Sequence, residues 1–146
     1  MILQDILRLK GSEVYAIRPQ ATLGDVVRSM MEHRCGALLV CADADCGRGI
    51  VGIITERDIL RACAERNGSI ADIPISDYMT VDLVTGTPEN SIEYIMGVMT
   101  DHRIRHLPVL DEEHRLLGMI SIGDLVKAQH HQTIVENHYL KSYIQS

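Results

Sequence analysis

The chain has 146 residues, about the size of one compact domain, and its 46% hydrophobic and 23% charged residues are typical of a globular protein. The net charge of −6 argues against a general nucleic-acid-binding surface, because such a surface needs a basic face. No apolar run approaches the roughly 20 residues that a membrane-spanning helix needs, so we expect no membrane partner.

The four cysteines, Cys35, Cys41, Cys46 and Cys63, form no CxxC pair, and no secretory signal precedes them. We therefore expect a cytoplasmic protein with reduced thiols. The spacing fits no standard zinc pattern, so no metal site is predicted. Buried cysteines that act as small apolar side chains are the simpler interpretation.

Residues 2–9 place apolar side chains on one helical stripe, and Gly11 suits the left-handed position after a helix end. We predict a short N-terminal helix that docks on the body of the protein. Residues 14–18 follow as an extended run, which Pro19 stops.

The next helix is predicted to open at Thr22, because Asp25 three residues later completes a capping-box pattern and apolar residues then recur at helical spacing. Residues 37–41 are a continuous apolar run, which is typical of a buried strand, and residues 49–54 predict a second strand. A helix over residues 56–65 completes the first half, before Asn67-Gly68 breaks the chain.

The second half repeats this order, with an extended run at 81–84, a helix from about Ser91, strands at 107–110 and 116–120, and a helix over 122–129. From Thr133 the tail predicts an additional amphipathic helix. Its apolar face could pack within the chain or form a dimer contact. We favour the dimer contact, because the two halves already supply a core; the apolar tail residues are Ile134, Tyr139, Leu140, Tyr143 and Ile144.

An internal duplication explains the repeated order. The stretch Gly52-Ile-Ile-Thr-Glu-Arg-Asp58 recurs downstream as Gly118-Met-Ile-Ser-Ile-Gly-Asp124. Upstream the corresponding residues of the two copies lie farther apart: Pro19 and Pro88 are 69 positions apart, whereas Gly52 and Gly118 are 66 apart. The first copy therefore has three extra residues, which we place in the loop at 42–48. Two units of roughly 60 residues would each be marginally stable alone, so we expect them to share a core.

Each stretch pairs a hydroxyl with an acid three residues later, as Thr55 with Asp58 and as Ser121 with Asp124. Such a pair caps a helix start, contributes about 1 kcal/mol and needs no ligand. The same arrangement serves a nucleotide, because N–H groups at a helix start favour phosphate and a carboxylate can accept ribose hydroxyls. From these residues alone, capping is the favoured interpretation.

The unit order, the two repeated stretches and the run His102-Arg-Ile-Arg-His-Leu-Pro-Val109 resemble the cystathionine β-synthase (CBS) domain pair, or Bateman module, over residues 14–127. The resemblance implies an α+β fold, an αβ sandwich in which two β-α-β-β-α repeats pack with pseudo-twofold symmetry, plus short helices at both ends. We expect a single module over 1–146, with the first repeat at 12–68, the second at 77–129 and a C-terminal helix at 130–146.

The resemblance also implies up to two clefts for adenosine-containing ligands such as AMP, ADP, ATP, NAD or S-adenosylmethionine, and a homodimer of modules. It assigns phosphate contact to Thr55 and Ser121, and ribose contact to Asp58 and Asp124. With the resemblance, ligand binding becomes the favoured interpretation for at least one site.

The basic run supplies His102, Arg103 and Arg105 as further candidates, because Arg suits bidentate contact with phosphate. Such charges are also ordinary at a solvated turn between a helix and a strand. The corresponding run in the first copy, His33-Arg34-Cys35-Gly36-Ala37, lacks a match for Arg105, which argues against two equivalent sites.

Arg57 could contact phosphate or pair with a neighbouring acid, and the sequence favours neither. Tyr15 and Tyr78 could form walls for an adenine ring, but ordinary packing is the favoured role for each.

The function predicted from these observations is that of an adenine-nucleotide-binding sensor, which signals energy or redox state to a regulated partner protein. The alternative is a structural module whose clefts no longer bind nucleotide and which serves only to dimerise. We do not expect an enzyme, because no nucleophile has a spaced base and no two acids obviously face one another.

Overall fold

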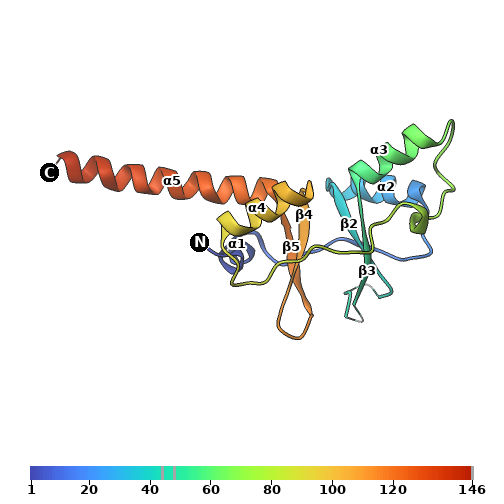
Figure 1. Cartoon of the computed structure of the whole chain (residues 1–146), viewed down its shortest axis with the longest axis horizontal. Helices are drawn as coiled ribbons and strands as arrows, with labels where there is room; N and C mark the ends of the chain where they lie inside the picture. The colour runs from blue at the N-terminus through green and yellow to red at the C-terminus, as the bar shows by residue number, and fades with distance from the viewer. Residues whose placement is uncertain (44, 48, 146) are drawn as a thin grey trace. The chain divides into compact units, whose positions relative to one another are not determined.

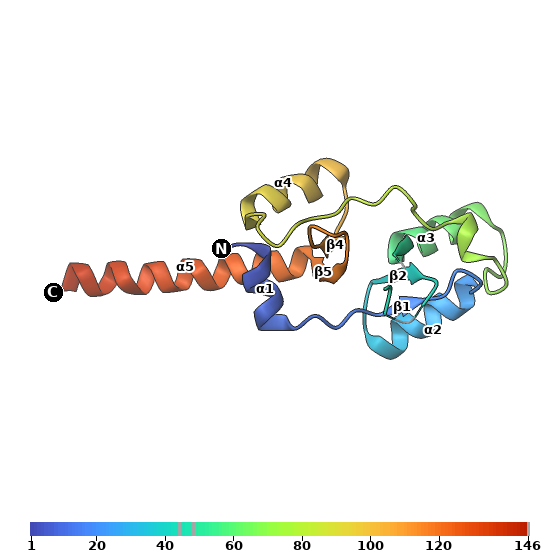
Figure 2. The same ribbon diagram turned by 90° about the horizontal axis from the view of Figure 1, so that it is seen from below.

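The computed structural model describes residues 1–43, 45–47 and 49–145, and these form five α-helices, one short 3-10 helix and five strands (Figures 1 and 2). Of the loop at 42–48, Ala44 and Arg48 lie outside the described residues. No helix in the described ranges is long and apolar enough to cross a membrane. The chain divides into two compact units, each described by itself. The first-repeat unit comprises Glu13–Val84 and Glu112–Leu116; the second-repeat unit comprises Met1–Ser12, Thr85–Asp111 and Leu117–Ser146.

A three-stranded sheet forms the centre of the first-repeat unit, in the order β1 (Ala16–Ile17), β2 (Ala37–Cys41) and β3 (Ile50–Thr55). β1 pairs with β2 in parallel, and β2 pairs with β3 antiparallel. All five residues of β2 are buried, as its continuous apolar run predicts. The remaining elements are α2 (Leu23–His33), α3 (Glu56–Glu65) and the 3-10 helix η1 (Ile75–Asp77). The core side chains are Leu23, Val26, Met30, Leu38, Val40, Ile54, Ala62, Ile73, Ile75 and Tyr78.

The second-repeat unit contains a two-stranded sheet of β4 (His106–Leu110) and β5 (Leu116–Ser121). Helices α1 (Leu3–Lys10) and α4 (Ile92–His102) pack with α5 (Ile122–Gln145), and Figure 2 shows α1 lying across α5. The core side chains are Leu3, Ile6, Ile92, Ile95, Met99, Leu107, Val109, Ile120, Leu125 and Ala128. The α+β class and the two tandem repeats predicted from the sequence are confirmed.

Backbone pairing shows that the duplication holds in three dimensions. In the first repeat Ile17 pairs in parallel with Val40, and in the second Gly86 forms a parallel bridge with Val109. Both partners are shifted along the chain by the same spacing that separates Pro19 from Pro88. In the described part of the second repeat, the parallel pairing that corresponds to β1 with β2 is limited to this one bridge. The extended run predicted at 81–84 is therefore shifted, because the residue that pairs with the sheet is Gly86.

A short helical segment packs beside the start of the first long helix of each repeat: α1 beside the start of α4, and η1 beside the start of α2. The N–H of Leu3 donates to the carbonyl of Asn90 (3.0 Å), and the N–H of Ile75 donates to the carbonyl of Ala21 (3.1 Å). α1 and η1 are thus structural counterparts, with Leu3 in the place of Ile75. The N-terminal helix, predicted only to dock on the body, packs in the unit of the second repeat.

Glycines at equivalent positions permit this packing. A Cβ on Gly118 would lie 2.6 Å from Cδ2 of Leu7, and a Cβ on Gly52 would lie 2.8 Å from the carbonyl oxygen of Thr80. The close approach of α1 and of the connector explains why both repeated stretches begin with glycine.

The helical ends differ in part from the predictions. Gly11 follows α1 with φ of 91°, which glycine adopts without strain, but its ψ of 170° is not that of a left-handed helical residue. The predicted helix at 122–129 and the predicted tail helix form one continuous helix, α5, which projects from the rest of its unit (Figure 1). The residues between them, Gln129 to Thr133, include no Gly or Pro, so nothing in the sequence stops the helix.

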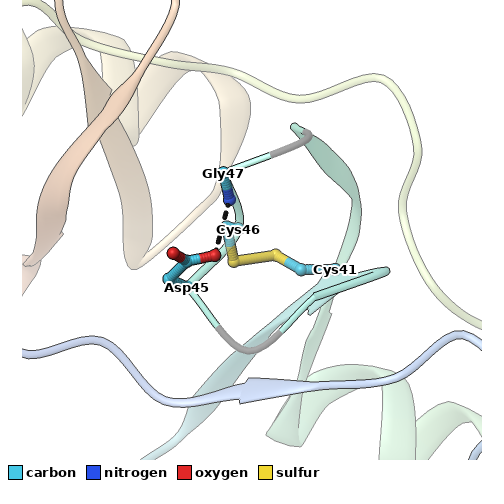
Figure 3. Close-up of a disulfide and its surroundings, with 4 residues drawn as sticks. All are labelled: Cys41, Asp45, Cys46 and Gly47. Atoms are coloured by element: carbon cyan, nitrogen blue, oxygen red, sulfur yellow. Dashed lines mark hydrogen bonds between the residues drawn. A yellow bond between two sulfur atoms is a disulfide. The ribbon is translucent and has the colours of Figure 1, made fainter.

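The expectation of four reduced thiols is wrong, because Cys41 and Cys46 form a disulfide with a Cα–Cα distance of 5.1 Å (Figure 3). The register shifts at Cys41, at the end of β2, and Cys46 adopts a positive φ of 57°. The loop thus folds back and brings the two sulfurs together. Cys35 and Cys63 have free thiols.

Candidate functional site

The start of α5 holds the second-repeat candidates in a reciprocal cap. The N–H of Ser121 donates to Oδ2 of Asp124 at 2.9 Å, and the N–H of Asp124 donates to Oγ of Ser121 at 3.1 Å. A negative charge at a helix start is favourable, because the helix dipole is positive there. The local spacing of the two residues is enough to produce this geometry.

Lys10 adds a cation to this carboxylate, which sequence reasoning missed. Its Nζ donates to Oδ2 of Asp124 at 2.7 Å and to the carbonyl of Met119 at 2.9 Å. Burial raises the pKa of Asp124, but the hydrogen bonds from Lys10 and Ser121 lower that pKa by more, so it lies below the ordinary value of 3.8. The long separation of the two residues in the sequence hides this pair from any local pattern.

The start of α3 repeats the arrangement in the first-repeat unit. Thr55 donates to Oδ2 of Asp58 from its N–H at 2.9 Å and from its hydroxyl at 3.1 Å. The Asp58 residue is 8% exposed, and the cation nearest to its carboxylate is Arg61, with Nη2 3.5 Å from Oδ1. The same Nη2 of Arg61 donates to the carbonyl of Tyr78 at 3.0 Å, so this cation is shared between the carboxylate and the backbone.

A backbone bond ties each helix start to the turn that precedes the neighbouring strand. The N–H of Ile122 donates to the carbonyl of Arg105 at 2.8 Å, and the N–H of Glu56 donates to the carbonyl of Gly36 at 3.0 Å. The basic run is therefore brought next to the start of α5. In the first repeat the same place is taken by Gly36, as the sequence comparison predicts.

The basic run itself lies at the end of α4. His102 is the last helical residue, and Arg103 adopts a left-handed φ of 55°, as its counterpart Arg34 does with φ of 53°. The side chains of Arg103 and Arg105 are exposed, and no acidic group in the described chain pairs with either. Two cations therefore remain available to an anion beside the helix start.

The remaining candidates are Arg57 and the two tyrosines. Arg57 is exposed, and neither Glu56 nor Asp58 pairs with it in the described part of the chain. Tyr78 is buried, and its hydroxyl donates to Glu65 at 2.9 Å, which fits ordinary packing. The Tyr15 ring stacks on His33 with the ring centroids 4.0 Å apart. No cluster of metal-ligating side chains occurs among the residues that the structure describes.

The chain belongs to the CBS domain family. The family model of the CBS domain matches residues 5–65 and 75–131. The two matches begin in α1 and at η1, so they include the counterpart segments identified from the backbone contacts.

Known proteins resemble the chain over almost its whole length. The mitochondrial CBS domain-containing protein CBSX3 of Arabidopsis thaliana is 37% identical over 149 residues, which cover 98% of this chain and 71% of that protein. A crystal structure of a CBS-domain-containing protein from Agrobacterium tumefaciens has a TM-score of 0.82 and 36% identity, and the match covers 88% of this chain and 99% of that one.

A more distant structure is described as complexed with a ligand. It is that of a CBS domain protein from Pyrobaculum aerophilum complexed with AMP, with a TM-score of 0.72 and 24% identity, and the match covers 85% of this chain and 89% of that one. At this identity the likeness concerns the fold alone.

Proposed function

We propose that the chain is a non-catalytic regulatory module that binds an adenine nucleotide (AMP, ADP, ATP or NAD) at the starts of α5 and α3. The main support is the start of α5. The Asp124 carboxylate is fixed there at a helix N-terminus, and the backbone N–H of Ile122 binds the carbonyl of Arg105 in the basic run. The carboxylate of Asp124 suits ribose hydroxyls, and Ser121 with Arg103 or Arg105 suits phosphate.

Helix capping alone explains why Ser121 and Asp124 occur together. The basic run is therefore the feature that favours ligand binding over capping. The protein has a net charge of −6, yet Arg103 and Arg105 are exposed without an acidic partner in the described chain. An anion would supply that partner. The Pyrobaculum protein, whose structure is a complex with AMP, shares the fold, which is in keeping with a nucleotide as the ligand.

Regulation would follow from unequal affinity of the ligand for two states of the protein, since a ligand shifts an equilibrium only by that difference. We assign the response to a homodimer whose change is sensed by a partner protein, in keeping with an energy or redox sensor in the cytoplasm.

The second candidate is a structural module that dimerises and does not bind nucleotide. It is favoured by the carboxylates themselves, because capping already gives each of them hydrogen-bond partners.

A thermal-shift panel with AMP, ADP, ATP, NAD and S-adenosylmethionine separates the two candidates. A ligand at 100 times its dissociation constant should stabilise the folded protein by about 2.7 kcal/mol. We expect at least one nucleotide to raise the melting temperature of the wild type and to do so much less for Asp124→Ala.

Asp25→Ala is the matched control, because Thr22 and Asp25 form the same capping box at the start of α2, outside the repeated stretches. It should weaken the fold like Asp124→Ala but keep the full ligand-induced shift. A panel in which no nucleotide stabilises the wild type would favour the structural module.

A further inference from the structure

The second-repeat carboxylate already has a cationic partner. Lys10 is the last residue of α1, and its Nζ bonds both Asp124 and the carbonyl of Met119. All three residues belong to the second-repeat unit. The side chain of Lys10 is 34% exposed and that of Asp124 is 23% exposed, so a ligand from solvent can reach the pair.

Hydrogen-bond capacity limits what else Asp124 can accept. A carboxylate offers about two acceptor positions on each oxygen. Oδ2 accepts from the N–H of Ser121 at 2.9 Å and from Nζ of Lys10 at 2.7 Å. A ribose diol that donates one hydroxyl to each oxygen therefore competes with Lys10 for Oδ2, because the Ser121 bond belongs to the helix cap.

In the first repeat the cation nearest to the carboxylate is Arg61, whose Nη2 lies 3.5 Å from Oδ1 of Asp58, and no cation in the described chain donates to Oδ2. Leu7 and Met79 occupy equivalent places against Gly118 and Gly52, but beyond Met79 the connector is no longer helical, because Thr80 bridges Ile53, so it does not continue as α1 does to Lys10. The second donor to Oδ2 of Asp58 is the hydroxyl of Thr55, which can rotate away without breaking an ion pair.

We propose that Lys10 is a specificity-determining residue of the second-repeat site: it competes with the ribose diol for Asp124 and so lowers the affinity of that site for adenosine-containing ligands. This inference rests on the proposed function. The lowered pKa of Asp124 agrees with a firm contact. The competition would give two repeats with equivalent hydroxyl and acid groups different affinities.

Calorimetric titration with adenosine tests the competition, because adenosine has the diol but no phosphate that Lys10 could attract. The titration uses an Asp58→Ala background, which leaves only the second-repeat site, with Asp58→Asn as a substitute if the fold suffers. Lys10→Met keeps the apolar stem and removes the charge. Lys127→Met, at an exposed position on α5, is the control for the change in net charge.

We expect Lys10→Met to tighten adenosine binding by about fivefold, the size of a partly exposed ion pair, and Lys127→Met to leave it unchanged. The gain should disappear with 2′-deoxyadenosine, which lacks one hydroxyl of the diol, whereas a merely structural effect of the substitution would persist.

Unchanged or weaker adenosine binding by Lys10→Met would overturn the role of Lys10 and leave the proposed function standing. Failure of the wild type and of every variant to bind adenosine or AMP would overturn both.

Discussion

Three effects act on the charge of the Asp124 carboxylate, and each has a separate cause. Ser121 fixes it by local capping, Lys10 supplies an opposite charge from a distant helix, and partial burial opposes ionisation. Because the first two outweigh the third, the carboxylate stays ionised under ordinary conditions. A nucleotide would therefore meet an acceptor of hydrogen bonds at this position.

The ion pair with Lys10 should make stability depend on pH. The folded pKa of Asp124 lies below the ordinary value of 3.8, so the pair stabilises the fold above that pH, and this contribution is lost as the pH falls through the folded pKa. We expect Lys10→Met to lower the free energy of unfolding by about 1 kcal/mol at pH 7, since the pair is partly exposed.

Urea unfolding of the wild type and of Lys10→Met, at a series of pH values from 7 downwards, measures this difference. It should stay constant until about pH 4 and then shrink. A difference that does not change with pH would show that Lys10 acts through packing and not through the charge of Asp124.

Local pattern predicted the residues of each helix start, but not their distant partners. Thr55 with Asp58 and Ser121 with Asp124 meet because the two members of each pair are three positions apart, which is about one helical turn. Lys10 meets Asp124 only through the packing of α1 on α5. The disulfide was missed because the argument used the cellular compartment of thiols, whereas the loop geometry decides whether Cys41 and Cys46 can meet.

Elements of the two repeats match one another in their packing contacts. Gly118 admits Leu7 of α1, and Gly52 admits the connector at Met79 and Thr80. The sequence showed the periodicity that predicts each helix and strand, but not the unit in which α1 packs. An apolar stripe indicates that one face of a helix is buried, but not which surface covers that face.

Alanine substitutions at these glycines should have different costs. The new methyl group at position 118 meets the end of a flexible leucine side chain, but at position 52 it meets a backbone carbonyl that cannot move independently. We expect Gly52→Ala to cost about 1–3 kcal/mol and Gly118→Ala to cost less.

Chemical denaturation of both variants measures the two costs, and Leu7→Ala serves as the test of cause. Combined with Gly118→Ala, it should cost less than the sum of the single changes. Equal costs for the two glycines would contradict this account of the packing.

The C-terminal half of α5 exposes large apolar side chains from Ile134 to Ile144. We propose that this face forms the homodimer contact. Removal of residues 133–146 should then convert the dimer to a monomer, which light scattering after gel filtration would detect.

The truncation should leave the helical content of the remaining chain in place, because the side chains of residues 133–145 are exposed and contribute little to the core. A truncated protein that keeps the mass of the full-length dimer would place the contact elsewhere.

At the scale of the whole molecule, the duplication yields two units with the same backbone pairing and different polar surroundings. The fold class followed from the sequence because each repeat carries its own hydrophobic pattern. The difference between the repeats was visible only in part, in the missing counterpart of Arg105. Lys10 on one side and Arg61 on the other became evident once the segments were packed.

Equilibrium titration of AMP by calorimetry is the most direct test of nucleotide binding at the two helix starts. We predict saturable binding to the wild type and to Asp25→Ala, and loss of that binding in the double variant Asp58→Ala/Asp124→Ala with its fold intact by circular dichroism. AMP that binds the double variant as tightly as the wild type would show that these carboxylates are helix caps and nothing more.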